Sequence, residues 1–337
     1  MKNYFRSILV LLSICIFTSG LVAQKNNFAV QQSFSIKSAG GWDYLTVYGN
    51  KLYVSHGTQV NILDKSTGDS IGFIPNTTGV HGIAFEPIHQ LGFTSNGRLN
   101  NVFAFNINTN EIKATIATGE NPDAIMYDPF SKTIITCNGR SKDLSFIDAN
   151  TLQVIATVAV GGKPETAVSN EAGKIFVNVE DKNEIVVINA KTYVVEAHWS
   201  IAPIESPTGL AIDKATKRLF AGGEKLLGVI NAETGEMVTT IGIGDGCDGV
   251  AFDNKSKLIF TSNGEGTMSI IKEVDASHFS LVENITTAKG ARTIAIDEAT
   301  HKIYLPTADF EALPADAKPN TRPKMIPGSF KVLVANK

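Results

Sequence analysis

Short apolar runs alternate with polar turns along residues 120–161, where the pattern is clearest. The turns are Asp-Pro-Phe-Ser-Lys (128–132), Asn-Gly-Arg-Ser-Lys-Asp (138–143) and Asp-Ala-Asn-Thr (148–151). Brief β-branched runs bounded by such turns predict β-strands, here Ala124–Tyr127, Thr133–Cys137, Leu144–Asp148 and Val154–Val158. Four strands joined this tightly form an antiparallel meander, whose apolar faces need neighbours to cover them.

The rest of the chain supplies those neighbours, because the same pattern returns about every 40 residues. A period of this length built from four strands is typical of a β-propeller blade, and seven starts predict seven blades. The residues expected just before each first strand are Asp43, His81, Asp123, Glu165, Thr208, Asp248 and Arg292. The predicted fold is therefore an all-β, seven-bladed propeller of four-stranded antiparallel blades, forming one domain over residues 24–337.

The two ends of the repeat predict how the ring closes. The seventh repeat has two strands, a proline-containing insertion at Phe310–Gly328 and a third strand at Ser329–Val334. Phe28–Ile36 resembles a fourth strand and is expected to complete this last blade, which leaves no exposed sheet edge. The insertion follows a second strand, so it is either a lid or rim over the central opening or a passive surface loop.

The first 23 residues have the features of a secretory signal peptide. Lys2 and Arg6 precede an apolar run, Ile8–Phe17, that is short for a bilayer span, and small residues follow it. We expect a periplasmic or secreted protein that starts near Gln24, has no membrane anchor after cleavage and is a monomer. Cys137 and Cys247 then remain and are expected to be buried free thiols.

Charge narrows the possible partners. Removing Lys2 and Arg6 with the leader changes the formal net charge from −3 to −5. A nucleic-acid-binding protein would present a basic surface, so no nucleic-acid partner is expected. No P-loop, nucleophile elbow or H-E-x-x-H motif is present.

Polar residues gather at one end of the predicted blades, because the start of each first strand and the end of each second strand share a rim. Such a rim around a channel is a candidate site for a small ligand or a protein partner. The candidate ligand-binding residues are Asp43, His56, His81, Asn96, Arg98, Asp123, Asn138, Arg140, Glu165, Glu180, Asp248, Asn263, Glu265 and Arg292. The turns of the opposite face are expected to be ordinary solvated hairpins.

Carboxylates that point into one funnel repel one another and need compensation. In one interpretation Asp123, Glu165 and Asp248, with His81 or His56, hold a divalent cation, either Ca²⁺ or a transition metal. In the other, each acid caps local backbone N–H groups and pairs with an arginine. A further hypothesis places Arg98, Arg140 and Arg292 as a clamp for a carboxylate or phosphate.

Several segments carry a family resemblance: LYVSHG, FTSNGR, NGRSKD, KPETAV, GDGCDGVAF and YLPTADF. Through them residues 28–337 resemble the YncE-like, YVTN-repeat bacterial β-propellers. The resemblance implies an exported seven-bladed propeller without an assigned activity; one branch is associated with DNA binding, which the acidic balance here disfavours.

Two functions remain open. The first is a non-enzymatic binding or scaffold protein, whose funnel takes a ligand, a metal ion or a partner loop. The alternative is a metal-dependent, lactonase-like hydrolase, in which a funnel metal polarises a carbonyl and His81 or His56 transfers protons. A propeller that serves a redox system lacks any cofactor-attachment motif in this sequence.

Overall fold

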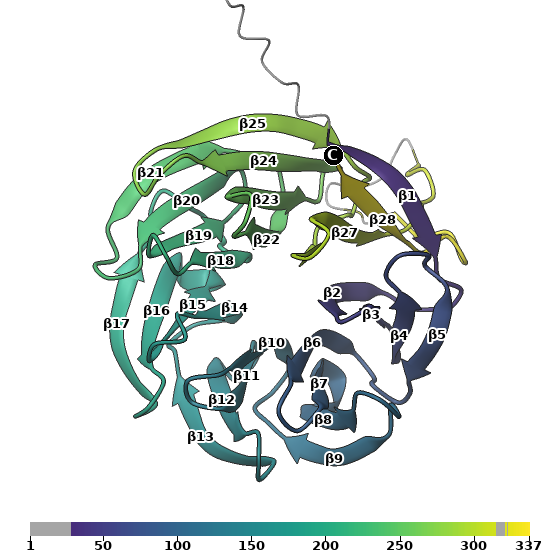
Figure 1. Cartoon of the computed structure of the whole chain (residues 1–337), viewed down its shortest axis with the longest axis horizontal. Helices are drawn as coiled ribbons and strands as arrows, with labels where there is room; N and C mark the ends of the chain where they lie inside the picture. Colours follow the sequence, from purple (N-terminus) through teal and green to yellow (C-terminus); the bar gives the residue numbers. More distant parts are fainter. Residues whose placement is uncertain (1–27, 315–320, 322) are drawn as a thin grey trace, which may run out of the picture.

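Seven four-stranded antiparallel sheets surround a central opening (Figure 1). The computed structural model describes residues 28–314, 321 and 323–337. The predicted signal peptide and the middle of the insertion lie outside these residues. Within them, no helix is long and apolar enough to cross a membrane.

Each blade is a meander whose strands run from the channel outward, and blades 1 to 6 are continuous in sequence. Blade 1 contains β2 (Trp42–Tyr48), β3 (Lys51–His56), β4 (Gln59–Asp64) and β5 (Ser70–Ile74). Blade 2 contains β6 (Val80–Glu86), β7 (Leu91–Asn96), β8 (Asn101–Asn106) and β9 (Ile112–Ala117). Blade 3 contains β10 (Pro122–Asp128), β11 (Thr133–Asn138), β12 (Asp143–Asp148) and β13 (Gln153–Ala159). The predicted strands of blade 3 are thus confirmed, each extended by one to three residues.

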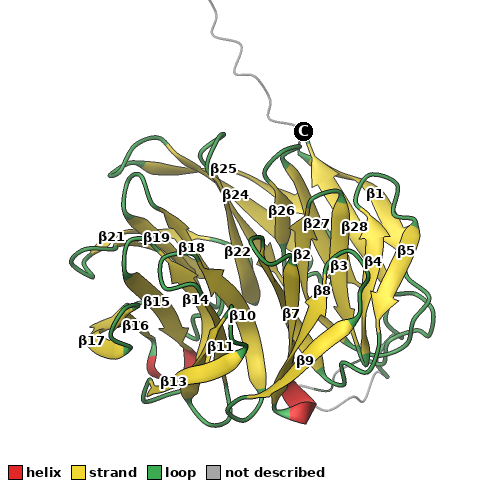
Figure 2. Cartoon of the chain, turned by 60° about the horizontal axis from the view of Figure 1, so that its bottom comes forward, coloured by secondary structure: helices red, strands yellow, loops and turns green. Residues whose placement is uncertain are grey.

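The next three blades follow the same order. Blade 4 contains β14 (Pro164–Ser169), β15 (Lys174–Val179), β16 (Glu184–Asn189) and β17 (Val194–Ser200). Blade 5 contains β18 (Leu210–Asp213), β19 (Arg218–Gly222), β20 (Leu226–Asn231) and β21 (Met237–Gly242). Blade 6 contains β22 (Cys247–Asp253), β23 (Leu258–Asn263), β24 (Thr267–Glu273) and β25 (Phe279–Thr286). Two single-turn 3₁₀ helices, η1 (Gly97–Leu99) and η2 (Glu180–Lys182), follow second strands and lie at one end of the ring (Figure 2).

Blade 7 closes the ring as predicted. It contains β26 (Ala295–Asp297), β27 (Lys302–Thr307), β28 (Lys331–Asn336) and, as its outermost strand, β1 (Ala29–Ser35). β1 runs antiparallel to β28, with Phe34 opposite Val332. The third strand begins two residues later than predicted, because the backbone N–H of Ser329 still donates to the Ile326 carbonyl in the preceding turn.

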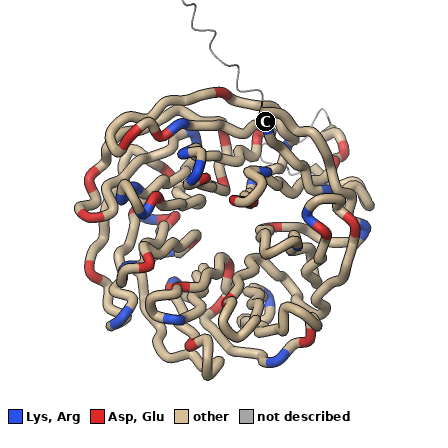
Figure 3. The backbone as a smooth tube through the Cα atoms, in the orientation of Figure 1, with Lys and Arg blue, Asp and Glu red and all other residues tan. Residues whose placement is uncertain are grey.

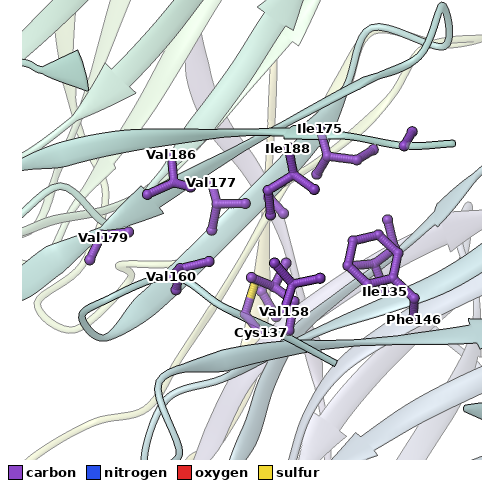
Figure 4. Packing of buried hydrophobic residues seen from close by; sticks show 14 residues of the cluster. Ile135, Cys137, Phe146, Val158, Val160, Ile175, Val177, Val179, Val186 and Ile188 are labelled. Carbon is purple, nitrogen blue, oxygen red and sulfur yellow. The ribbon is translucent and has the colours of Figure 1, made fainter. Parts of the chain in front are cut away.

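The apolar core lies between blades rather than inside one sheet. Seven clusters of buried residues occur among the described residues, one at each junction of neighbouring blades. At the junction of blades 3 and 4, Cys137 and Val158 face Val177 and Ile188 (Figure 4). Second and third strands are covered on both faces, which explains their nearly continuous apolar sequence. Cys137 and Cys247 are buried and free, as expected.

Candidate functional site

The innermost strand of five blades carries a register shift near its start. The sequence predicted that these positions come just before the first strands. In the structure they lie inside the strands, at the register shifts: Asp43, His81, Asp123, Glu165 and Asp248. A β-bulge leaves a residue out of the ladder and re-aims its side chain. Local backbone geometry therefore accounts for polar residues on strands that otherwise face the channel with apolar groups.

Hydrogen bonds between blades fix the backbone of this inner ring. The Thr293 hydroxyl donates to the Asp43 carbonyl at 2.6 Å, and the Ser95 hydroxyl donates to the Asp123 carbonyl. Thr293 and Ser95 are fully buried and Asp43 and Asp123 are partly exposed, so these bonds tie the backbone of the inner ring to the neighbouring blades. Among the described residues, similar bonds cross four of the five other junctions: Thr46 to Ile83, Asn178 to Gly209, Thr208 to Cys247, and Ser262 to Arg292.

Asp43, His81 and Asp123 converge at one mouth of the channel. His81 Nδ1 lies 2.6 Å from Asp43 Oδ2 and 3.6 Å from Asp123 Oδ1. One potential ligand atom from each residue lies within 4.8 Å of the others, a group suited to a metal ion. Blades 1, 2 and 3 each provide one member, and acidic positions border the opening on these inner strands (Figure 3).

The ligand set predicted from sequence, Asp123, Glu165 and Asp248, does not form such a group among the described residues. Two cations intervene. Lys163 Nζ lies 2.5 Å from Glu165 Oε1 and 2.5 Å from Glu180 Oε2. Arg292 contacts Asp248 and lies 3.6 Å from Asp43 Oδ1. The metal interpretation therefore fits Asp43 and Asp123, the ion-pair interpretation fits Glu165 and Asp248, and Asp43 takes part in both.

Crowding of the carboxylates raises several pKa values. Burial and the negative charges of Asp43 and Asp248 raise the pKa of Asp123 to about 6. The charge of His81 opposes this rise but does not cancel it. Burial and Asp123 also raise the pKa of Glu165, despite the opposing Lys163. Burial disfavours the charged form of His81, but its hydrogen bond to Asp43 and the surrounding carboxylates outweigh this and raise its pKa. A ring that favours protonation in this way would equally favour a bound cation.

Below the mouth the channel becomes apolar. A cavity of about 110 Å³ is lined by residues of blades 1 to 4, including Tyr44, Ile83, Ile125 and Met126. Burial, followed by the charges of Asp123 and Asp43, raises the pKa of Tyr44 well above its ordinary value. The polar site is thus a shallow cap on an apolar channel.

The three predicted asparagines of the rim have structural partners. Asn138 Oδ1 accepts from the Thr136 hydroxyl at 2.9 Å, and its Nδ2 donates to Asp143 and Ser145. Asn96 and Asn263 make matching bonds within their own blades and are fully buried. These side chains stabilise the blade ends, and none of them reaches the cluster at the mouth.

His56 also differs from the prediction. It is buried, stacks on Phe330 at a centroid distance of 3.9 Å, and bonds to the Ser38 hydroxyl and the Gly40 carbonyl. Burial lowers its pKa, against the effect of the Gly40 carbonyl. With both ring nitrogens occupied, His56 fastens the junction of blades 7 and 1 and is not available to a ligand.

The proposed arginine clamp is not present in the structure. Arg98 and Arg140 are exposed and form no ion pair among the described residues, whereas Arg292 pairs with the inner acids. Glu265 is exposed and accepts a hydrogen bond from the Thr267 hydroxyl at 2.8 Å. Arg98, Arg140 and Glu265 surround the mouth without converging.

The turns of the opposite face were predicted to be ordinary solvated hairpins, and their tips are indeed exposed, but the acids that begin them are not ordinary turn residues. Their first strands end in buried carboxylates that link blades: Asp213 binds Lys257 Nζ at 2.7 Å, and Asp253 binds His301 Nδ1 at 2.6 Å. In the sequence, each of these acids ends a first strand and is indistinguishable from an ordinary turn residue. Its partner, Lys257 or His301, belongs to the next blade and comes close only when the ring is formed.

No protein-family model matches the sequence, and no curated protein matches it. Solved structures do match. A chain of Kuenenia stuttgartiensis hydrazine synthase superposes with a TM-score of 0.70 and 14% identity, covering 80% of this chain and 94% of that one. A chain of a mitotic checkpoint complex gives a TM-score of 0.73 and 13% identity, covering 89% and 95%. At these identities the likeness concerns the fold alone, and the protein is a seven-bladed β-propeller.

Proposed function

We propose that this protein is a binding protein that holds a divalent cation at Asp43, His81 and Asp123 and, through it, a small ligand or partner group at the channel mouth. The observation that carries the proposal is the convergence of these three side chains on bulged strands. Three protein ligands leave coordination positions open for a further group. The apolar channel below favours binding over transport of water or ions.

The donor set narrows the choice of ion. Calcium prefers six to eight oxygen ligands, whereas imidazole together with carboxylates suits zinc, manganese or iron. A transition metal is therefore the better fit to one histidine nitrogen and two carboxylates. Coordination requires His81 Nδ1 without its proton, so the ion replaces the proton that this nitrogen now shares with Asp43.

Metal content measured on protein purified without chelator tests the proposal. We expect one ion per chain, lost in the Asp43→Asn/Asp123→Asn double variant and retained in Asp248→Asn, because Asp248 pairs with Arg292. Titration with Zn²⁺, Mn²⁺ and Ca²⁺ gives the preference. Absence of binding for all three ions would refute the proposal, and loss of the ion in Asp248→Asn would instead support the ligand set predicted from sequence.

A metal-dependent hydrolase is a second candidate, and one observation favours it. Glu165 is buried beside the cluster with a raised pKa, which suits a general acid or base at neutral pH. Turnover of lactones or esters by the metal-loaded protein, abolished in Glu165→Gln with the metal retained, would establish this activity. His56, the other proton carrier considered from sequence, is excluded by its packing.

We also propose that the protein is exported. The support is the sequence Lys2–Arg6 followed by the apolar run Ile8–Phe17. Cell fractionation with N-terminal sequencing should find a mature chain in the periplasm or medium that begins near Gln24. A chain that keeps Met1 in the cytoplasm would contradict this.

A further inference from the structure

A separate pocket of about 440 Å³ lies beside the acidic cluster, where blades 6, 7 and 1 meet. This volume is in the range of pockets that take small organic molecules. Its lining combines aromatic, cationic and glycine residues: Gly41, Trp42, Gly264, Lys289, Gly290, Arg292, Phe310 and Pro323. Nothing in the proposed cation site requires it.

Two aromatic side chains form its apolar wall. The rings of Trp42 and Phe310 lie 6.1 Å apart at an interplanar angle of 46°. Packing fixes the Trp42 side chain, because its ring also stacks on the buried Phe330 ring at a centroid distance of 5.3 Å. An ordered indole of this kind offers a flat face to a planar ligand at little cost in side-chain entropy.

Two cationic side chains line the same pocket, and only one of them is already paired with carboxylates. Arg292 shares its charge with Asp248 and Asp43. Lys289 is exposed and has no ion pair among the described residues. Its backbone is fixed, since the Thr307 hydroxyl donates to the Lys289 carbonyl at 2.9 Å. Lys289 therefore presents an uncompensated positive charge at the edge of the pocket, on a backbone that is held in place.

Glycines keep the pocket open. A Cβ atom at Gly41 would meet nothing within 4 Å, so the missing side chain is unfilled space and not a tight contact. Gly290 has φ +82°, and a Cβ there would come within 3.1 Å of Phe310. Gly290 thus allows Lys289 and Phe310 to approach the same space, while Gly41 leaves that space empty.

We propose that this pocket binds a planar aromatic carboxylate, with its ring against Trp42 and Phe310 and its carboxylate on Lys289 and Arg292. Aromatic walls select the ring, and the guanidinium and ammonium groups select the negative charge. The pocket does not need a metal. If a cation also binds Asp43 as proposed above, it weakens the hold of Asp43 on Arg292 and strengthens carboxylate binding.

Calorimetric titration of the full chain with 2-naphthoate, in chelator, tests the pocket. The neutral isostere 2-naphthamide should bind about tenfold more weakly, because it loses the contacts with both cations. Lys289→Gln should weaken 2-naphthoate about threefold to fivefold, as expected for a partly exposed charge pair. Gly41→Trp should abolish binding by filling the space.

Matched variants separate these effects from general ones. Arg98→Gln removes an exposed, unpaired arginine of the same rim, and Gly242→Trp adds an indole at another glycine whose Cβ meets nothing within 4 Å. Both should leave 2-naphthoate affinity unchanged. Equal affinity for 2-naphthoate and 2-naphthamide, or full binding to Gly41→Trp, would overturn the proposal. Metal-free binding that Zn²⁺ leaves unchanged would refute only the coupling to the cation site.

Discussion

Replacing Asp123 by asparagine should stabilise the metal-free protein. The Asp123 side chain is 15% exposed and burial raises its pKa from 3.8 to about 6. Because a tenfold change in an acid's dissociation constant is worth about 1.4 kcal/mol, keeping Asp123 ionised costs about 3 kcal/mol of stability at neutral pH. Asparagine removes that cost at nearly the same volume. The attraction to His81 is already included in this pKa, but the buried amide brings a desolvation cost of its own, so we expect a net gain of about 1–3 kcal/mol.

The pH dependence gives the sign of the effect. Below pH 3.8 the carboxyl is protonated in both folded and unfolded states and contributes nothing. Between pH 3.8 and about 6 the folded state alone keeps the proton, so stability falls as the pH rises. Above about pH 6 the full cost remains. The advantage of Asp123→Asn should thus be present at pH 7.5 and disappear near pH 4.

Equilibrium urea unfolding in chelator, at pH 7.5 and pH 4, measures this difference. The same variant should lose the bound metal, so it gains stability while it loses binding, as expected of a strained functional site. Asp123→Asn that is less stable than the parent at pH 7.5 would refute the reasoning. It would mean that the ion pair with His81 outweighs the burial and repulsion of Asp123.

Four other outcomes follow from the same geometry. Gly97→Ala places a Cβ 2.6 Å from His81 Nε2, so it should displace the imidazole and weaken metal binding about tenfold in a calorimetric titration. Metal affinity should fall as the pH drops from 8 to 6, because the raised pKa of His81 lets protons compete; a flat profile would exclude His81 as a ligand. His56→Ala should cost about 2–4 kcal/mol in urea unfolding without changing metal affinity, since its packing and bonds are structural. Asp253→Asn should destabilise the protein by about 2–4 kcal/mol at pH 7, because it disrupts the hydrogen bonds that the buried carboxylate accepts from Ser256 and from the half-buried His301. The pKa of Asp253 is lowered in the folded state, so this loss should shrink as the pH falls below about 4, and an equal loss at pH 3 would contradict it.

The inner ring shows where sequence reasoning succeeded and where it failed. The aligned starts correctly placed Asp43, His81, Asp123, Glu165 and Asp248 at one end of the channel. They did not show which of these side chains approach each other. That depends on the order of blades around the ring and on Lys163 and Arg292, which neutralise two of the five positions.

The rim residues that proved structural share a physical cause. Asn138 was selected because it ends a second strand, yet its amide is consumed by Thr136 and Asp143. His56 was selected for the same reason, yet Phe330 covers its ring. A strand end in the sequence does not reveal whether a polar side chain turns into its own blade or out to the channel.

The sequence by itself determined the repeat, the number of blades, the strand order and the closure of the last blade by β1. These follow from local turn chemistry and from the alternation of apolar runs, which act over a few residues each. The tertiary structure alone decided the composition of the cation cluster, the acid links on the opposite face and the aromatic pocket beside Arg292. Each of these joins residues from different blades, tens of positions apart in the cluster and the acid links and more than two hundred apart in the pocket, so only the closed ring brings their side chains into contact.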